Sequence, residues 1–151
     1  MITLIKKMFQ GGEKEKQASF TDSEMKKRIA ACVLLLEVAH ADDECSPAEM
    51  AHIVETVKAR FALSQAYATE LLELADRERR NSVDLWQFTN YLNQKLSKDE
   101  KMAVLEDVWR IIFVDGHLEM HEDHLAHKLA NLLQLTHKEL IDVKLKAKAG
   151  G

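Results

Sequence analysis

One short stretch of the chain gathers the side chains that could do chemistry. Residues 113–127 read FVDGHLEMHEDHLAH and contain two aspartates, two glutamates and four histidines. A second acidic stretch, residues 38–53, reads VAHADDECSPAEMAHI. Carboxylate oxygens around a turn suit Ca²⁺ and Mg²⁺, whereas imidazole nitrogens suit Zn²⁺ and Ni²⁺. Both stretches are therefore candidate metal sites.

The two acidic stretches share one spacing. In each, an aspartate ends a long apolar run and a glutamate follows seven positions later, at Asp42 and Glu49 and again at Asp115 and Glu122. A helical hairpin of that length brings such carboxylates to the same side of its turn. We expect a divalent cation there, with Ca²⁺, Mg²⁺ or Mn²⁺ favoured by the oxygen ligands and Zn²⁺ as the alternative. The predicted ligands, in descending order, are Asp115, Glu122, Asp42, Glu49, Asp43 and Glu119.

Two other interpretations of these side chains stay open. Acidic residues in the first turn of a helix stabilise its dipole with no metal bound, and Glu49 is also the third-position partner of Ser46 in a capping box. The histidines at positions 117, 121, 124 and 127 share helix faces in part and could ligate zinc or nickel. Neither turn is an EF-hand, because the acids, glycine and final glutamate of that loop fall at other positions. HEDH likewise differs from the HExxH of metalloproteases.

Sequence motifs for catalysis are missing. The chain has no glycine-rich phosphate loop, no nucleophile elbow and no CxxC pair. The sequence therefore predicts a protein that is not an enzyme and has no catalytic residue. A metal-dependent hydrolase that activates a cation-bound water is a further alternative. The net charge of −4 argues against a nucleic-acid partner.

The elements that would position these residues are helices. Five glycines, one proline and abundant Ala, Leu, Glu and Lys favour an all-α fold. Four capping boxes, TDSE, SPAE, SKDE and THKE, predict helices over 22–41, 47–60, 98–114 and 137–149. Apolar periodicity predicts three more, over 66–80, 83–96 and 121–134. The result is a single-domain bundle of about seven helices.

The helices recur in the same order. A long apolar helix, an acidic turn, a second helix and a third helix appear in the first half and again in the second. Asp42 aligns with Asp115 and Glu49 with Glu122 at an offset of 73, and Leu63 aligns with Leu135 at an offset of 72. The pattern predicts a duplicated three-helix unit, with residues 83–96 as the bridge.

The N-terminal residues differ from the rest. Residues 1–20 are predicted to form a leader and a flexible polar linker, and residues 21–151 the helical domain. Ile2, Ile5 and Phe9 recur at helical spacing beside two lysines, so residues 1–10 are a candidate amphipathic segment for peripheral membrane contact. The alternative is a turn that packs on the domain. Two cysteines, Cys32 and Cys45, fit a reducing cytoplasm.

With these helices and turns in view, the chain resembles the TerB family of tellurite-resistance proteins over about residues 23–149. The motif is a helix ending in Ala-Asp-Gly and an acidic residue opening the next helix. The second copy keeps Asp115, Gly116 and Glu122, whereas the first has Asp43 in place of the glycine.

The resemblance implies a pseudo-two-fold helical bundle whose two acidic turns are related cation sites. It also implies a cytoplasmic, stress-associated adaptor that acts with membrane-associated Ter-type protein partners. The alternative function is a metal-free structural or interaction bundle docked at the cytoplasmic membrane face.

Overall fold

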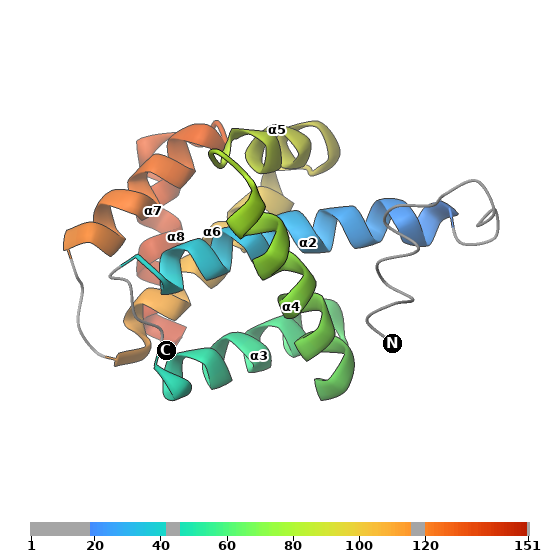
Figure 1. The fold of residues 1–151 in the computed structure, drawn as a ribbon. Coiled ribbons are helices and arrows are strands. Elements are labelled where there is room, and N and C mark those ends of the chain that lie inside the picture. The colour runs from blue at the N-terminus through green and yellow to red at the C-terminus, as the bar shows by residue number, and fades with distance from the viewer. Residues whose placement is uncertain (1–18, 42–45, 116–119, 151) are drawn as a thin grey trace.

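The structure is a computed structural model that describes residues 19–41, 46–115 and 120–150. In this part of the chain, seven α-helices and one short 3₁₀ helix follow one another, and there is no strand. Their bounds are α2 (Ser19–Ala39), α3 (Pro47–Phe61), α4 (Gln65–Asn81), α5 (Trp86–Lys95), α6 (Lys98–Ile112), η2 (Phe113–Asp115), α7 (Met120–Leu132) and α8 (His137–Gly150). The prediction of an all-α bundle is confirmed (Figure 1).

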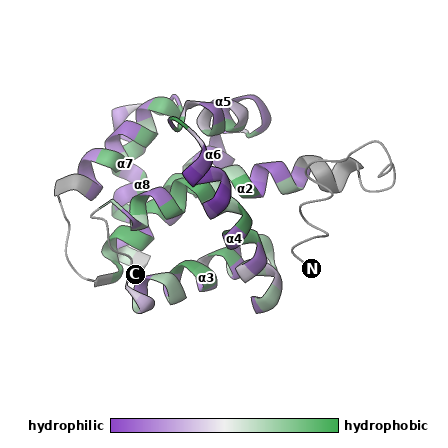
Figure 2. Ribbon diagram, in the orientation of Figure 1, coloured by the Kyte–Doolittle hydropathy of each residue, from purple (hydrophilic) through white to green (hydrophobic). Residues whose placement is uncertain are grey.

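Helix α2 is the centre of the bundle. Every residue from Ile29 to Ala39 is buried except Glu37. A helix that is apolar on all sides needs neighbours on all sides, and α2 contacts α3, α4, α5, α6 and α7. Figure 2 shows hydrophobic residues along this part of α2 and hydrophilic residues at the C-terminal end of α4.

Helix starts follow the predicted caps at three of four positions. Ser46, Ser97 and Thr136 each accept a hydrogen bond from the backbone N–H of a glutamate three residues on, and that glutamate's carboxylate accepts the cap residue's own N–H. The fourth prediction is wrong, because α2 begins at Ser19 and therefore already includes Thr21. Helix α5 also begins later than predicted, at Trp86, whose N–H donates to Asp84 Oδ1 at 3.0 Å.

The duplicated unit is visible in the packing. In each half the first helix packs most extensively against the third, α2 against α4 and α6 against α8, while α5 joins the halves. The backbone repeats at the end of the middle helices as well. Ala62 after α3 and Gln134 after α7 both have positive φ, at 56° and 63°. These residues are 72 positions apart, the offset predicted from Leu63 and Leu135.

Candidate functional site

The second acidic turn begins where α6 tightens into η2. Trp109 is fully buried, and the ring of Phe113 stacks on it with centroids 5.6 Å apart. This stacking anchors η2 to the core of α6. The backbone of Asp115 ends η2, and α7 begins at Met120. Residues 116–119 and the side chain of Asp115 lie outside the described part of the structure.

Glu122 is the most distinctive acid of this turn. It lies in the first turn of α7 and is only 3% exposed. Burying a carboxylate is costly unless its charge is compensated. The N-terminus of α7 supplies part of that compensation through its backbone N–H groups and dipole. A cation bound at the turn would be another source of compensation.

Glu49, the corresponding acid of the first turn, is engaged differently. Its Oε1 accepts the Ser46 N–H at 2.8 Å, and its own N–H donates to Ser46 Oγ at 3.1 Å. This capping box accounts for a glutamate at position 49 without a metal. The two copies therefore use the aligned glutamates in different environments, one partly exposed at a cap and one buried.

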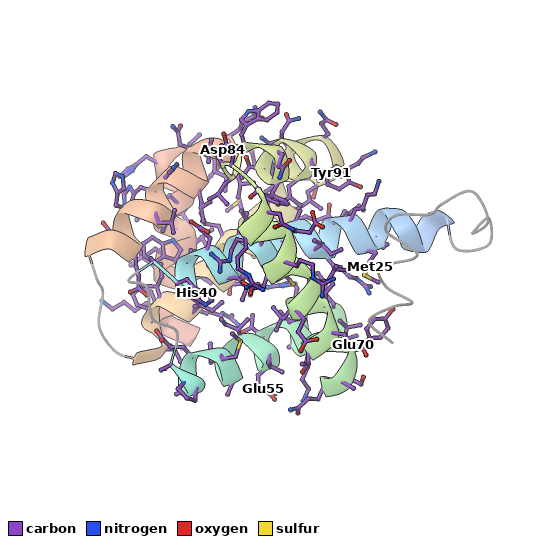
Figure 3. All side chains as sticks on the ribbon, in the orientation of Figure 1. Met25, His40, Glu55, Glu70, Asp84 and Tyr91 are labelled. Carbon is purple, nitrogen blue, oxygen red and sulfur yellow. The ribbon has the colours of Figure 1, made fainter. Side chains whose placement is uncertain are left out.

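The described helix ends that flank the two acidic stretches lie on the same side of the molecule. The end of α2, the start of α3, η2 and the start of α7 are all toward the left of Figure 1. Helix η2 contacts α3, and α2 contacts α7. His40, at the end of α2, is at this end too (Figure 3), and its Nδ1 lies 2.9 Å from the Leu36 carbonyl oxygen. The fold thus brings into contact helices that flank the two acidic stretches, although those stretches are separated by about half of the sequence.

Four of the six predicted ligands are not placed. Asp42, Asp43 and Glu119 lie outside the described residues, as does the side chain of Asp115. Among the side chains that are described, no three from His, Cys, Asp and Glu converge in a way that could hold a metal ion. Of the six predicted ligands only Glu49 and Glu122 are among those side chains, so the cation site at the acidic turns stays a prediction.

An ion pair that the sequence did not predict joins the two halves. Arg60 near the end of α3 donates from Nε and Nη2 to the two carboxylate oxygens of Asp107 on α6, at 2.7 and 2.9 Å. The Asp107 side chain is only 4% exposed. Its hydrogen bonds, together with its charge, raise the pKa of Arg60 despite partial burial. A local signal existed in hindsight, since two acids interrupt the apolar run VLEDVWRII.

Only two of the predicted histidine ligands, His124 and His127, have described side chains, and their surroundings differ. His117 lies outside the described residues, and the side chain of His121 is not described. His124 is exposed. His127 faces two neighbours: its Nε2 lies 3.7 Å from Asp123 Oδ1, and its ring centroid lies 6.1 Å from that of His137 on α8. The contact with α8 could not be read from spacing within α7.

The structure describes one of the two cysteines, Cys32. Cys32 is fully buried in α2. Burial, with a smaller effect from the charge of Asp107, raises the pKa of its thiol far above the ordinary value. A thiol that stays protonated is a weak nucleophile and a weak metal ligand. Cys45 lies outside the described residues.

A cavity lies at the opposite end of the bundle from the acidic turns. Its volume is about 370 Å³, and it opens between the first half of α2, the end of α3 and the start of α6. Its charged lining residues are Glu24, Lys27, Arg28, Arg60 and Glu100. Three are basic and two acidic, so the cavity has a mixed charge.

Among the described residues, no helix is both long and apolar enough to cross a bilayer.

Comparison with known proteins identifies the family. The family model described as "Tellurite resistance protein TerB" matches residues 28–145. The fold is also similar to the crystal structure of a protein of unknown function from Porphyromonas gingivalis W83. The TM-score is 0.63 at 19% sequence identity, over 82% of this chain and 89% of that one. No curated protein sequence matches the chain.

Proposed function

The chain belongs to the TerB family of tellurite-resistance proteins, and from this premise we propose that it is a non-catalytic stress-response adaptor whose acidic turns bind a divalent cation. Asp115 and Glu122 are the first ligands in this proposal. Asp42 and Glu49 follow them, with Asp43 and Glu119 as further oxygen donors. In this proposal, binding of the ion at the acidic turns is coupled to the binding of a partner protein.

The burial of Glu122 carries this proposal. Most first-turn glutamates of this chain serve as caps at the surface, as Glu49 and Glu100 do. Glu122 instead is 3% exposed beside a turn rich in acids. A cation at that turn would offset the cost of burying the carboxylate and would collect oxygens from both sides of the turn. Hard ions such as Ca²⁺, Mg²⁺ or Mn²⁺ suit such ligands better than Zn²⁺ does.

The adaptor role draws support from an exposed apolar corner. Val83 is fully exposed and Trp86 is 58% exposed, where α4 connects to α5. Exposed tryptophan is enriched among the residues that dominate protein interfaces. By family resemblance, the partners would be membrane-associated Ter-type proteins, and the protein would then act at the cytoplasmic side of a membrane. Residues 1–10 would add peripheral membrane contact.

One observation favours a metal-free alternative. Since the capping box of Glu49 is complete, the first acidic turn has a structural reason for its glutamate that needs no ion. In that alternative the bundle is a structural or interaction module docked at the membrane face, and its carboxylates only stabilise helix ends. The two functions differ in whether cations change the stability of the fold.

Thermal unfolding tests the cation site. The protein is treated with EDTA, and its midpoint is measured alone and with added Ca²⁺, Mg²⁺, Mn²⁺ or Zn²⁺. An ion at a hundred times its dissociation constant stabilises the native state by ~2.7 kcal/mol. For a chain of this length the midpoint should rise by roughly 5–10 °C. We expect the rise to disappear in Asp115→Asn and Glu122→Gln.

Glu100→Gln is the matched control. Glu100 is also in the first turn of its helix and caps Ser97, but it is exposed and far from the acidic turns. Glutamine preserves the cap, so this variant should keep the full response to the ion. If no cation raises the midpoint of the wild-type protein, the metal-free alternative replaces the proposed function.

A further inference from the structure

The cavity between α2, the end of α3 and the start of α6 is a second candidate binding site. Its volume of about 370 Å³ lies within the range of small-molecule pockets. The walls are mainly apolar, formed by Ala31, Phe61, Ala62, Leu96, Ala103 and Val104. Small-molecule pockets combine such walls with a small number of polar groups that orient the ligand. The charges of this cavity therefore indicate which ligand it fits.

Four of the five charged groups in the cavity already have partners within the protein. Lys27 Nζ donates to Glu24 Oε2 at 3.1 Å. Arg60 donates to both carboxylate oxygens of Asp107, at 2.7 and 2.9 Å. Glu100 Oε1 accepts a backbone N–H at 2.8 Å in the capping box that begins α6. A ligand would have to compete with these partners for each of the four groups.

Arg28 is the exception. Its Nε is buried and has no hydrogen-bond partner among the described residues, which also give its guanidinium no ion pair. The guanidinium carbon lies 5.4 Å from the centre of the Phe61 ring. That ring attracts the positive charge but offers the N–H groups no oxygen acceptor. Because a buried donor without an acceptor is costly, the cavity holds a cationic donor group that an anionic oxygen would satisfy.

We propose that this cavity binds a small organic carboxylate, whose oxygens accept hydrogen bonds from Arg28 and whose apolar part packs against Leu96 and Val104. A carboxylate is planar and matches the N–H fork of a guanidinium group. A monoanion fits better than a phosphate dianion, because Glu24 and Glu100 line the same cavity and repel additional negative charge. The site shares no residue with the acidic turns and therefore stands independently of the proposed function.

Titration of octanoate and of benzoate into the full-length, ¹⁵N-labelled protein at pH 7 tests the proposal. Each probe should shift the amide signals of residues around the cavity, and the shifts give its dissociation constant. We expect Arg28→Met to weaken binding by roughly tenfold or more, because it removes charge-assisted hydrogen bonds. Ala103→Leu should also weaken binding, since the larger side chain takes up space in the cavity. Glu100→Gln should strengthen it, because a repelling charge is lost while the cap is kept.

Arg77→Met is the matched control. Arg77 is also half-buried, and its Nη1 has no hydrogen-bond partner among the described residues, but it lies on α4 and does not line the cavity. This variant should bind both probes as the wild type does, and so should Glu122→Gln, which separates this test from that of the acidic turns.

Three results would overturn the proposal. The first is that neither octanoate nor benzoate shifts the signals of the wild-type protein. The second is that Arg28→Met, shown by circular dichroism to be folded, binds the probes as tightly as the wild type. The third is that 1-octanol or inorganic phosphate binds as tightly as octanoate, since the cavity would then not select a carboxylate on an apolar body.

Discussion

At the scale of single residues, the buried charge of Asp107 matters more to stability than the surface charges do. Its carboxylate is almost without solvent and depends on two hydrogen bonds from Arg60. Arg60 keeps about a third of its side chain in water. Removing Arg60 would leave the buried carboxylate uncompensated, whereas the guanidinium left by the loss of Asp107 could turn to solvent.

We therefore expect Arg60→Ala to lower the free energy of unfolding by about 3 kcal/mol, measured by urea denaturation at pH 7. The loss is expected because the substitution leaves the buried carboxylate of Asp107 without a compensating positive charge. Lys138→Ala is the control, because Lys138 pairs with Asp142 at the surface and should leave the urea midpoint unchanged. If both substitutions change the urea midpoint equally, Arg60 does not stabilise the buried carboxylate of Asp107 in the way we infer.

Cys32 makes the free energy of unfolding depend on pH in the alkaline range. In the unfolded chain its thiol ionises near the ordinary pKa of 9.0, whereas burial raises the native pKa well above that value. The native state therefore holds a proton that the unfolded state releases, and stability falls as pH rises above about 9. The contribution is ~1.4 kcal/mol per pH unit. In urea titrations from pH 8 to 11, Cys32→Ala should show a shallower loss than wild type; parallel curves would contradict this.

At the scale of the elements, the ends of the middle helices show how the repeat is encoded. After α3, the Leu63 N–H donates to the Lys58 carbonyl, and after α7 the Leu135 N–H donates to the Ala130 carbonyl. Both bonds span five residues and enclose a residue of positive φ, Ala62 or Gln134. This is the Schellman arrangement, in which glycine is the preferred residue. The chain uses it twice without glycine.

Ala62→Gly should therefore stabilise the protein by about 0.5–1 kcal/mol, because the left-handed conformation costs alanine more than glycine. Ala59→Gly is the matched control, one turn earlier on the exposed side of α3. There the same substitution should destabilise by a similar amount, since glycine disfavours a helix interior. In differential scanning calorimetry, the unfolding midpoint should rise for Ala62→Gly and fall for Ala59→Gly. Midpoints that fall together would exclude strain at Ala62.

At the scale of the whole molecule, neither half can bury its own apolar surface. Helix α2 of the first half contacts α5, α6 and α7 in addition to its own partners. The ion pair of Arg60 with Asp107 also crosses between the halves. A repeat whose central helix is apolar on every side requires its neighbour.

We expect the separated halves, residues 1–82 and 83–151, to lack a cooperative thermal transition when each is followed by circular dichroism at 222 nm. The reason is that each half exposes the apolar surface that the other covers. Mixing the halves should restore helical signal and a transition. A cooperative transition in either half alone would show that the three-helix unit is a complete folding unit.

Much of this protein was predictable because its decisive interactions are local. Caps at Ser46, Ser97 and Thr136 join residues three positions apart, so spacing alone determines them. Apolar periodicity likewise indicated the helices, and the repeated order of turns indicated the family. The prediction failed at Thr21, where a capping box in the sequence lies inside a helix that begins earlier.

The roles of single site residues were decided only by tertiary packing. Glu49 and Glu122 align in the repeat, yet one is a partly exposed cap and the other is buried, because their helices meet different neighbours. The contacts of Arg60 with Asp107 and of His127 with His137 are equally invisible in local spacing. The sequence by itself determined where helices begin and which acids flank the turns, since those depend on residues a few positions apart. Only the tertiary structure decided which charges lose water, since burial depends on which helices pack together.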